Sequence, residues 1–161
     1  MAQSAGARVV VSEVNPFRIS LAEQLDLKTV DPTTTDLINL ITRQTNGAGA
    51  DIIFKVSASA AGAELMTKLP RTRGRIVVVG IFGEAPKVDL FRFFWRELIL
   101  LGARVYERED FDAAIQLAAS GKLPLERLVT NTCPLKELAR GMKHMEKGGK
   151  VMKVLVRCSE D

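Results

Sequence analysis

The chain has 161 residues, of which 47% are hydrophobic and 26% are charged. This composition can fill one hydrophobic core, and it is typical of a folded domain with at most a short appendage rather than of a disordered chain. The net charge of +4 comes from basic residues that are scattered among acidic ones, without the aromatic-basic alternation of a stacking surface. We therefore expect no nucleic-acid partner.

The cysteines, the histidine and the apolar runs narrow the class further. Cys133 and Cys158 are too few for a disulfide framework, so we expect a reducing, cytoplasmic location. His144 is the only histidine, and no CxxC or HxxxH spacing for a metal occurs. The N-terminus lacks a signal-peptide pattern, and no apolar run is long enough to span a bilayer, so no membrane contact is expected.

Short β-rich runs alternate with helical patterns along the chain, which indicates βαβ units and a parallel sheet. Their near-continuous apolar character favours strands that helices cover on both faces. The predicted strands are residues 8–13, 28–30, 51–56, 75–80, 98–105 and 151–156, with a shorter one at 128–132. The predicted fold class is α/β, with a doubly wound parallel sheet.

The helices between these strands are predicted from apolar residues at helical spacing. Asn15 is expected to cap the first helix, and Pro16 suits its first turn. Beyond Gly121 the pattern changes to a loop, and Pro134 is expected to begin the last helix. Residues 59–68 are predicted to form a small-residue helix that packs closely on the sheet. The predicted inward faces of the other helices are Phe17, Leu21, Ala22 and Leu25; Leu37, Ile38, Leu40 and Ile41; Phe111, Ala114, Ile115 and Ala118; and Leu135, Leu138, Met142 and Met145.

The strand at 8–13 ends in a single carboxylate, Glu13. An acid at the end of the second strand of a doubly wound sheet accepts hydrogen bonds from adenosine ribose hydroxyls and repels a 2′-phosphate. An exposed charge that closes a strand is the alternative interpretation. The glycine-rich turn that precedes such a strand is missing, because the chain begins only a few residues upstream. We therefore expect most of a nucleotide-binding domain without its first strand and phosphate loop.

Six segments, none of them specific alone, follow one another in an order that resembles the medium-chain dehydrogenase/reductase family. They are GARVVVSE (6–13), VDP (30–32), GADIIF (49–54), GRIVVVG (74–80), LGA (101–103) and GKVMKVLV (149–156). The set is most similar to the zinc-type alcohol, polyol and threonine dehydrogenase branch.

The resemblance also implies how the chain is organised. Residues 1–121 would be an incomplete NAD-binding Rossmann domain, and residues 122–161 a helix-strand segment that returns to a catalytic domain. Family members place that zinc-binding domain and a Gly-x-Gly-x-x-Gly turn before this point. The chain is therefore expected to be N-terminally truncated.

The resemblance assigns cofactor contacts to residues at the strand ends, and each has a structural alternative. Arg18 would stack on adenine or merely cover its helix. Lys153 matches a basic position that reaches the cofactor pyrophosphate, and a solvated lysine is the alternative. The positions implied to line the ribose, adenine or nicotinamide are Val56, Ser57, Val79, Gly80, Ile81, Gly102, Ala103 and Arg104.

Some residues depart from this pattern or carry no chemistry. Lys55 and Ala58 stand where the family usually has Glu and Gly, which counts against an intact cofactor site. Lys55 would place a cation in an apolar strand, so it either reaches a carboxylate or phosphate or marks a lost constraint. His144 is interpreted as a surface residue and Cys133 as an unactivated thiol. The aromatic run 91–96 favours a helix on the sheet or a subunit contact.

The missing strand would be central in the sheet order 3-2-1-4-5-6. Its loss exposes the facing edges of strands 8–13 and 51–56, and each buried orphan group costs roughly 1–3 kcal/mol. Either these two strands pair directly or another strand fills the place, with 151–156 as the candidate, from this chain or from a neighbour. The resemblance and the apolar run 98–105 predict a homodimer through that edge.

Three functions are compatible with these observations. The first is the cofactor-binding part of a zinc-type alcohol or polyol dehydrogenase, with hydride passing between a secondary alcohol and NAD, and with zinc confined to the missing domain. The second is a truncated, inactive Rossmann domain that dimerises, in which NAD binding is weak or absent without the phosphate turn. The third, a short-chain or methyltransferase-type domain, fits residues 134–156 poorly. Whether this chain alone is an enzyme stays open, and we expect it to be inactive by itself.

Overall fold

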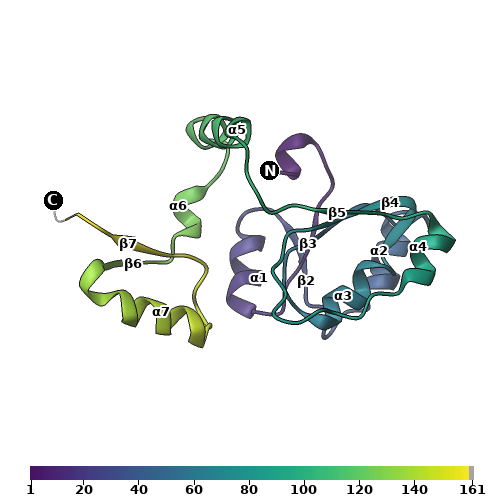
Figure 1. Ribbon diagram of the computed structural model, residues 1–161, viewed down its shortest axis with the longest axis horizontal. Helices are drawn as coiled ribbons and strands as arrows, with labels where there is room; N and C mark the ends of the chain where they lie inside the picture. The colour runs from purple at the N-terminus through teal and green to yellow at the C-terminus, as the bar shows by residue number, and fades with distance from the viewer. Residues whose placement is uncertain (160–161) are drawn as a thin grey trace. The chain divides into compact units, whose positions relative to one another are not determined.

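The computed structural model describes residues 1–159 (Figure 1). Contacts divide the chain into two compact units, residues 1–35 with 107–161 and residues 36–106. The first unit is built from both ends of the chain, and the second is built from its middle. The sequence predicted a boundary between residues 121 and 122, and that domain boundary stays a prediction.

The first unit contains a β–α–β element at the predicted place, with its first strand shorter than the predicted 8–13. β1 (Val10–Ser12) and β2 (Lys28–Val30) pair in parallel, and α1 (Pro16–Glu23) connects them. Oδ1 of Asn15 accepts two backbone N–H groups of the first helical turn, at 2.9 and 3.2 Å, which confirms the predicted N-cap. Pro16 occupies the first helical position, where a backbone donor would lack an intrahelical partner.

The rest of the first unit contains a second parallel pair, β6 with β7. Its elements are η1 (Gln3–Ala5), α5 (Arg108–Ala119), α6 (Leu125–Leu128), β6 (Asn131–Pro134), η2 (Leu135–Glu137), α7 (Leu138–Lys147) and β7 (Val154–Arg157). The strand predicted at 128–132 begins later, because Leu128 belongs to the helical turn α6. Pro134 ends this strand in extended backbone, and the helical residues begin one position later.

The predicted inward faces of α5 and α7 are not buried. Phe111 and Ile115 on α5, like Met142 and Met145 on α7, are each more than half exposed. The buried residue of α7 is instead Gly141, where a β-carbon would lie 2.9 Å from the sulfur of Cys133. Apolar spacing therefore predicted that these helices form, but it was wrong about the face that they bury.

The second unit is a parallel sheet of three strands in the order β3–β4–β5. Its elements are α2 (Leu37–Gln44), β3 (Ala50–Lys55), α3 (Ala60–Met66), β4 (Pro70–Val78), α4 (Leu90–Arg96) and β5 (Ile99–Gly102). Ile76 in β4 and Ala63 in α3 are fully buried. The core of this unit is therefore supplied by the central strand and by the small-residue helix.

The strand pairing bears on two predictions about the sheet. Within residues 1–159, β1 pairs with β2 and β3 pairs with β4, and no ladder joins β1 to β3. β7 pairs with β6, from Asn131↔Val154 to Pro134↔Arg157. Residues 154–157 thus pair with β6 in this chain, and the filling of the place beside β1 and β3 by 151–156, from this chain or a neighbour, stays a prediction. The α/β class with parallel strands and connecting helices is confirmed.

Candidate functional site

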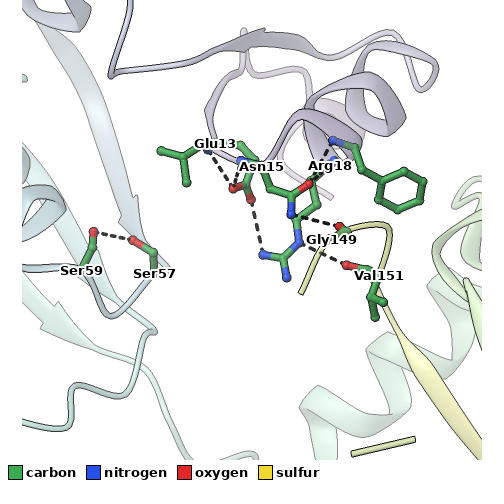
Figure 2. A network of polar contacts seen from close by, with 9 residues as sticks. Glu13, Asn15, Arg18, Ser57, Ser59, Gly149 and Val151 are labelled. Atoms are coloured by element: carbon green, nitrogen blue, oxygen red, sulfur yellow. Dashed lines mark hydrogen bonds and ion pairs between the residues drawn. The ribbon is translucent and has the colours of Figure 1, made fainter. Parts of the chain in front are cut away.

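Glu13 follows β1 and stabilises the turn in which it lies (Figure 2). Its Oε1 accepts the backbone N–H groups of Val14 at 2.8 Å and Asn15 at 3.0 Å. Its Oε2 lies 3.6 Å from a guanidinium nitrogen of Arg18, and the Glu13 side chain is 24% exposed. One oxygen is thus engaged in the turn, whereas the other is held by a long ion pair and can still accept hydrogen bonds from a ligand.

Arg18 connects this turn to the C-terminal part of the first unit. Besides its ion pair with Glu13, its Nε donates to the backbone carbonyl of Val151 at 3.4 Å. Val151 is buried. Neither interpretation of the sequence included this contact, and stacking of Arg18 on adenine stays a prediction.

Asn15 makes a contact that sequence reasoning missed. While Oδ1 caps α1, Nδ2 donates to the backbone carbonyl of Gly149 at 3.0 Å (Figure 2). The two residues are 134 positions apart, so a local pattern predicts the cap and not the longer contact. The one available signal was the choice of asparagine, whose amide carries a donor besides the acceptor that a cap needs.

Lys153 lies directly before β7, and its backbone is fixed by Thr130. Its N–H donates to Oγ1 of Thr130 at 3.3 Å, and its carbonyl accepts from that hydroxyl and from the Thr130 N–H, both at 3.0 Å. Residue 153 is exposed, so an anionic ligand could reach the ammonium. Its role at a pyrophosphate stays a prediction.

In the second unit, Lys55 ends β3 and is 5% exposed. Its Nζ donates to the backbone carbonyl of Ser57 and, at 2.9 Å, to the hydroxyl of the same residue. The ammonium also lies 5.0 Å from the centre of the Phe82 ring. The sequence left open a carboxylate or phosphate partner or a lost constraint, and the structure surrounds this charge with a carbonyl, a hydroxyl and an aromatic face.

Burial lowers the pKa of Lys55 below its ordinary value of 10.5. At a pH between the lowered pKa of the folded chain and the ordinary value of 10.5, the unfolded chain binds more protons than the folded chain. The free energy of unfolding therefore rises with pH across that range. The contribution of Lys55 to the free energy of unfolding is complete above pH 10.5 and is lost as the pH falls through the lowered pKa.

We expect the free energy of unfolding to rise with pH in this range in the unsubstituted chain, and we expect no such rise from position 55 in Lys55→Met. The urea midpoint of unfolding, measured at several pH values, compares the two proteins. An equal slope of midpoint against pH in both proteins would contradict the expectation.

Ser57 and Ser59 continue the polar network after β3. Their hydroxyl oxygens lie 3.1 Å apart (Figure 2), and Oγ of Ser59 accepts the Gly62 N–H at 3.2 Å as the cap of α3. A β-carbon on Gly62 would lie 2.9 Å from Nζ of Lys55. The glycine thus leaves room for the buried ammonium. Both Val56 and Ser57 are exposed and accessible to a ligand.

Gly80 allows the ends of β3 and β4 to approach closely. The N–H groups of Val79 and Gly80 both donate to the carbonyl of Lys55 at 3.0 Å. A β-carbon at position 80 would lie 2.4 Å from the carbonyl oxygen of Val56. The sequence placed Gly80 at the edge of a cofactor site, and the structure adds that no side chain fits there.

The predicted cofactor residues fall into two groups. Ala103 continues the ladder beyond β5, since its N–H donates to the Val78 carbonyl at 3.0 Å, and Arg104 is exposed. The first unit holds Glu13, Arg18 and Lys153, and the second holds Val56, Ser57, Val79, Gly80, Ile81, Ala103 and Arg104. Apart from Arg18 on α1, these residues lie at or beyond strand ends, and the contacts of all of them with a cofactor stay predictions.

The remaining candidate residues lie outside these hydrogen-bond networks. Among residues 1–159, no three His, Cys, Asp or Glu side chains gather as a metal site requires. No helix in the described part of the chain has the length and apolar character to cross a bilayer.

Cys133 is buried and His144 is exposed on α7. The run 91–96 forms most of α4, where the rings of Phe91 and Trp95 stack with centres 5.9 Å apart.

Comparison with known proteins adds a family to this geometry. Residues 1–120 match the sequence profile of the zinc-binding dehydrogenases. The 2-dehydro-3-deoxy-L-galactonate 5-dehydrogenase of Pseudoalteromonas atlantica is 44% identical over 161 residues, which cover 100% of this chain and 47% of that protein. The chain thus spans about half the length of the curated relatives it matches.

Two solved structures show the same α/β arrangement. The 2R,3R-butanediol dehydrogenase of Bacillus subtilis has a TM-score of 0.86 and 27% identity, over 98% of this chain and 46% of that chain. A protein of Sinorhizobium meliloti 1021, assigned to the zinc-binding dehydrogenases and solved with NADP, has a TM-score of 0.84 and 28% identity. The match covers 96% of this chain and 46% of that chain.

Proposed function

Because this chain belongs to the zinc-binding dehydrogenase family, we propose that it forms the cofactor-binding part of an alcohol or polyol dehydrogenase. In the complete enzyme, hydride passes between a secondary alcohol and the nicotinamide ring, which supplies the redox chemistry when bound. The residues described offer no ligand set for zinc, so the proposal gives this chain no part in polarising the alcohol. The observation that carries the proposal is the position of Glu13.

The carboxylate of Glu13 suits the ribose of NAD better than that of NADP. It stands at the carboxyl end of a parallel strand, where ligands bind in open α/β sheets. Its Oε2 is held by a 3.6 Å ion pair rather than by a hydrogen bond, which leaves acceptor capacity for a ribose diol. A 2′-phosphate in the same place would meet a like charge. We therefore propose NAD, although the Sinorhizobium structure holds NADP.

The remaining strand ends would line the rest of the cofactor. Lys153 offers a point cation to the pyrophosphate. The residues proposed beside the ribose, adenine and nicotinamide are Arg18, Val56, Ser57, Val79, Gly80, Ile81, Ala103 and Arg104. Exposure of residues 56, 57, 81 and 104 supports this assignment, because a ligand can reach them.

Substitution of Glu13 tests the proposal. We expect the unsubstituted chain to bind NADH with a submillimolar dissociation constant, and Glu13→Gln to weaken binding about tenfold, because a charged acceptor is replaced by a neutral amide. The preference for NADH over NADPH should also narrow. Glu23→Gln, at an exposed acid that ends α1, is the matched control and should change neither value. Fluorescence titration with NADH and with NADPH measures the dissociation constants of all three proteins. If the unsubstituted chain shows no binding up to several millimolar, that result would support an inactive domain instead.

The second candidate is an inactive domain that acts through dimerisation, and the exposure of β5 supports the dimerisation on which it depends. Ile99, Leu100 and Leu101 are 45–49% exposed in a strand at the edge of its sheet. Natural edge strands are usually protected by charge, proline or a covering element. We propose that the chain forms a homodimer through β5, whichever of the two functions holds. A cytoplasmic location stays a prediction from the cysteine content.

A further inference from the structure

The segment between α7 and β7 needs external contacts to hold its shape. It begins with Gly148 and Gly149, whose φ angles are +65° and +81°. Glycine backbones have many accessible conformations in the absence of tertiary contacts. The segment then carries Val151, which is buried, and Lys153, which is exposed. The position of the Lys153 side chain therefore depends on the contacts that fix this segment.

Those contacts come from two places in the first unit. Nδ2 of Asn15 donates to the Gly149 carbonyl at 3.0 Å, and Nε of Arg18 donates to the Val151 carbonyl at 3.4 Å (Figure 2). Thr130 holds the backbone of Lys153 at the other end of the segment. Asn15 lies two residues after Glu13 and Arg18 lies in the first turn of α1, so the connection from β1 to α1 both presents the carboxylate and holds the segment.

We propose that Asn15 is a positioning residue of the cofactor site, whose hydrogen bond to Gly149 holds Lys153 where its ammonium meets the cofactor pyrophosphate. This inference rests on the proposed function, since it requires a nucleotide whose ribose lies at Glu13. Oε1 of Glu13 accepts the backbone N–H of Asn15 at 3.0 Å, so the ribose acceptor and the tether are in direct contact. The turn thereby sets the separation between the ribose acceptor and the cation for the phosphates.

The asparagine side chain divides its two tasks between two atoms. Oδ1 caps α1, and Nδ2 donates to Gly149. Serine keeps a capping acceptor on a shorter side chain, and aspartate keeps the acceptor while its second oxygen replaces the donor. Substitutions can therefore remove the tether and leave the helix cap in place.

A double-mutant cycle on the full 161-residue chain tests the proposal by NADH titration. We expect Asn15→Ser to weaken NADH binding about fivefold in the unsubstituted background, and by less than about twofold when Lys153→Met is already present. The difference arises because the lost contact acts through the Lys153 ammonium. Asn15→Asp should behave in the same way. Equal weakening in both backgrounds would overturn the proposal.

Adenosine separates positioning from general damage, because it has the ribose but no phosphate. Its affinity should not change in Asn15→Ser, and a parallel loss of adenosine and NADH affinity would overturn the proposal. Asp36→Ser, which alters the cap of α2, is the matched control and should leave both affinities unchanged. If the unsubstituted chain binds NADH and Asn15→Ser binds it equally well, the tether alone is wrong. If the unsubstituted chain binds no NADH, the proposed function fails as well.

Discussion

Replacement of Gly80 by alanine should lower the free energy of unfolding of the second unit by about 3 kcal/mol. The new β-carbon would lie 2.4 Å from the Val56 oxygen and 2.9 Å from the Ser57 oxygen. Both are backbone atoms, so rotation of a side chain cannot relieve the overlap. Separation of the two strand ends would break the 3.0 Å hydrogen bonds from Val79 and Gly80 to the Lys55 carbonyl.

Gly83→Ala is the matched control for this substitution. No atom lies within 4 Å of a β-carbon at position 83, so we expect a change below about 0.5 kcal/mol. Trp95, the single tryptophan, lies on α4 in the same unit and reports urea unfolding by its fluorescence. If Gly80→Ala is no more destabilising than Gly83→Ala, the close approach of the strand ends is wrong.

The elements that the sequence predicted best are those that local chemistry determines. Asn15 caps α1 as predicted, and β2 coincides with the predicted strand 28–30. The predictions failed where distant partners decide the structure. β4 begins at Pro70 rather than at residue 75, because Pro70 pairs with Ala50 before the register shifts. The same holds for α7, since helical spacing does not reveal that the helix buries Gly141.

The sequence predicted where the candidate site residues lie along the strands, but it did not predict the contacts that their side chains make. The order of the strands places Glu13 at a carboxyl end, and the sequence alone suggested a carboxylate for a ribose there. The hydrogen bond between Asn15 and Gly149 joins residues 134 positions apart, which no local pattern contains. Lys55 was noticed as a cation in an apolar strand, but its solvation by Ser57 and Phe82 depends on how two loops meet.

Leu100→Lys should convert the proposed homodimer into a monomer. Leu100 lies within β5, is 49% exposed, and belongs to the edge strand of the sheet β3–β4–β5. In a two-fold pairing through this edge, both copies contribute the substituted residue, so two like charges are brought together. We expect the dimer dissociation constant to rise by at least about tenfold. Light scattering at micromolar concentration measures the mass of both proteins.

The opposite edge of the same sheet provides the control. Ile52 lies in β3, the other edge strand, and is 45% exposed, so Ile52→Lys adds the same charge at a comparable site. A dimer through β5 should survive this substitution. A monomer before any substitution, or a loss of the dimer in Ile52→Lys alone, would contradict the assignment. Pairing through β5 joins two sheets into one continuous sheet, so the backbone N–H and C=O groups at the free edge of β5 gain partners, and the exposed side chains 99–101 gain neighbours from the second copy.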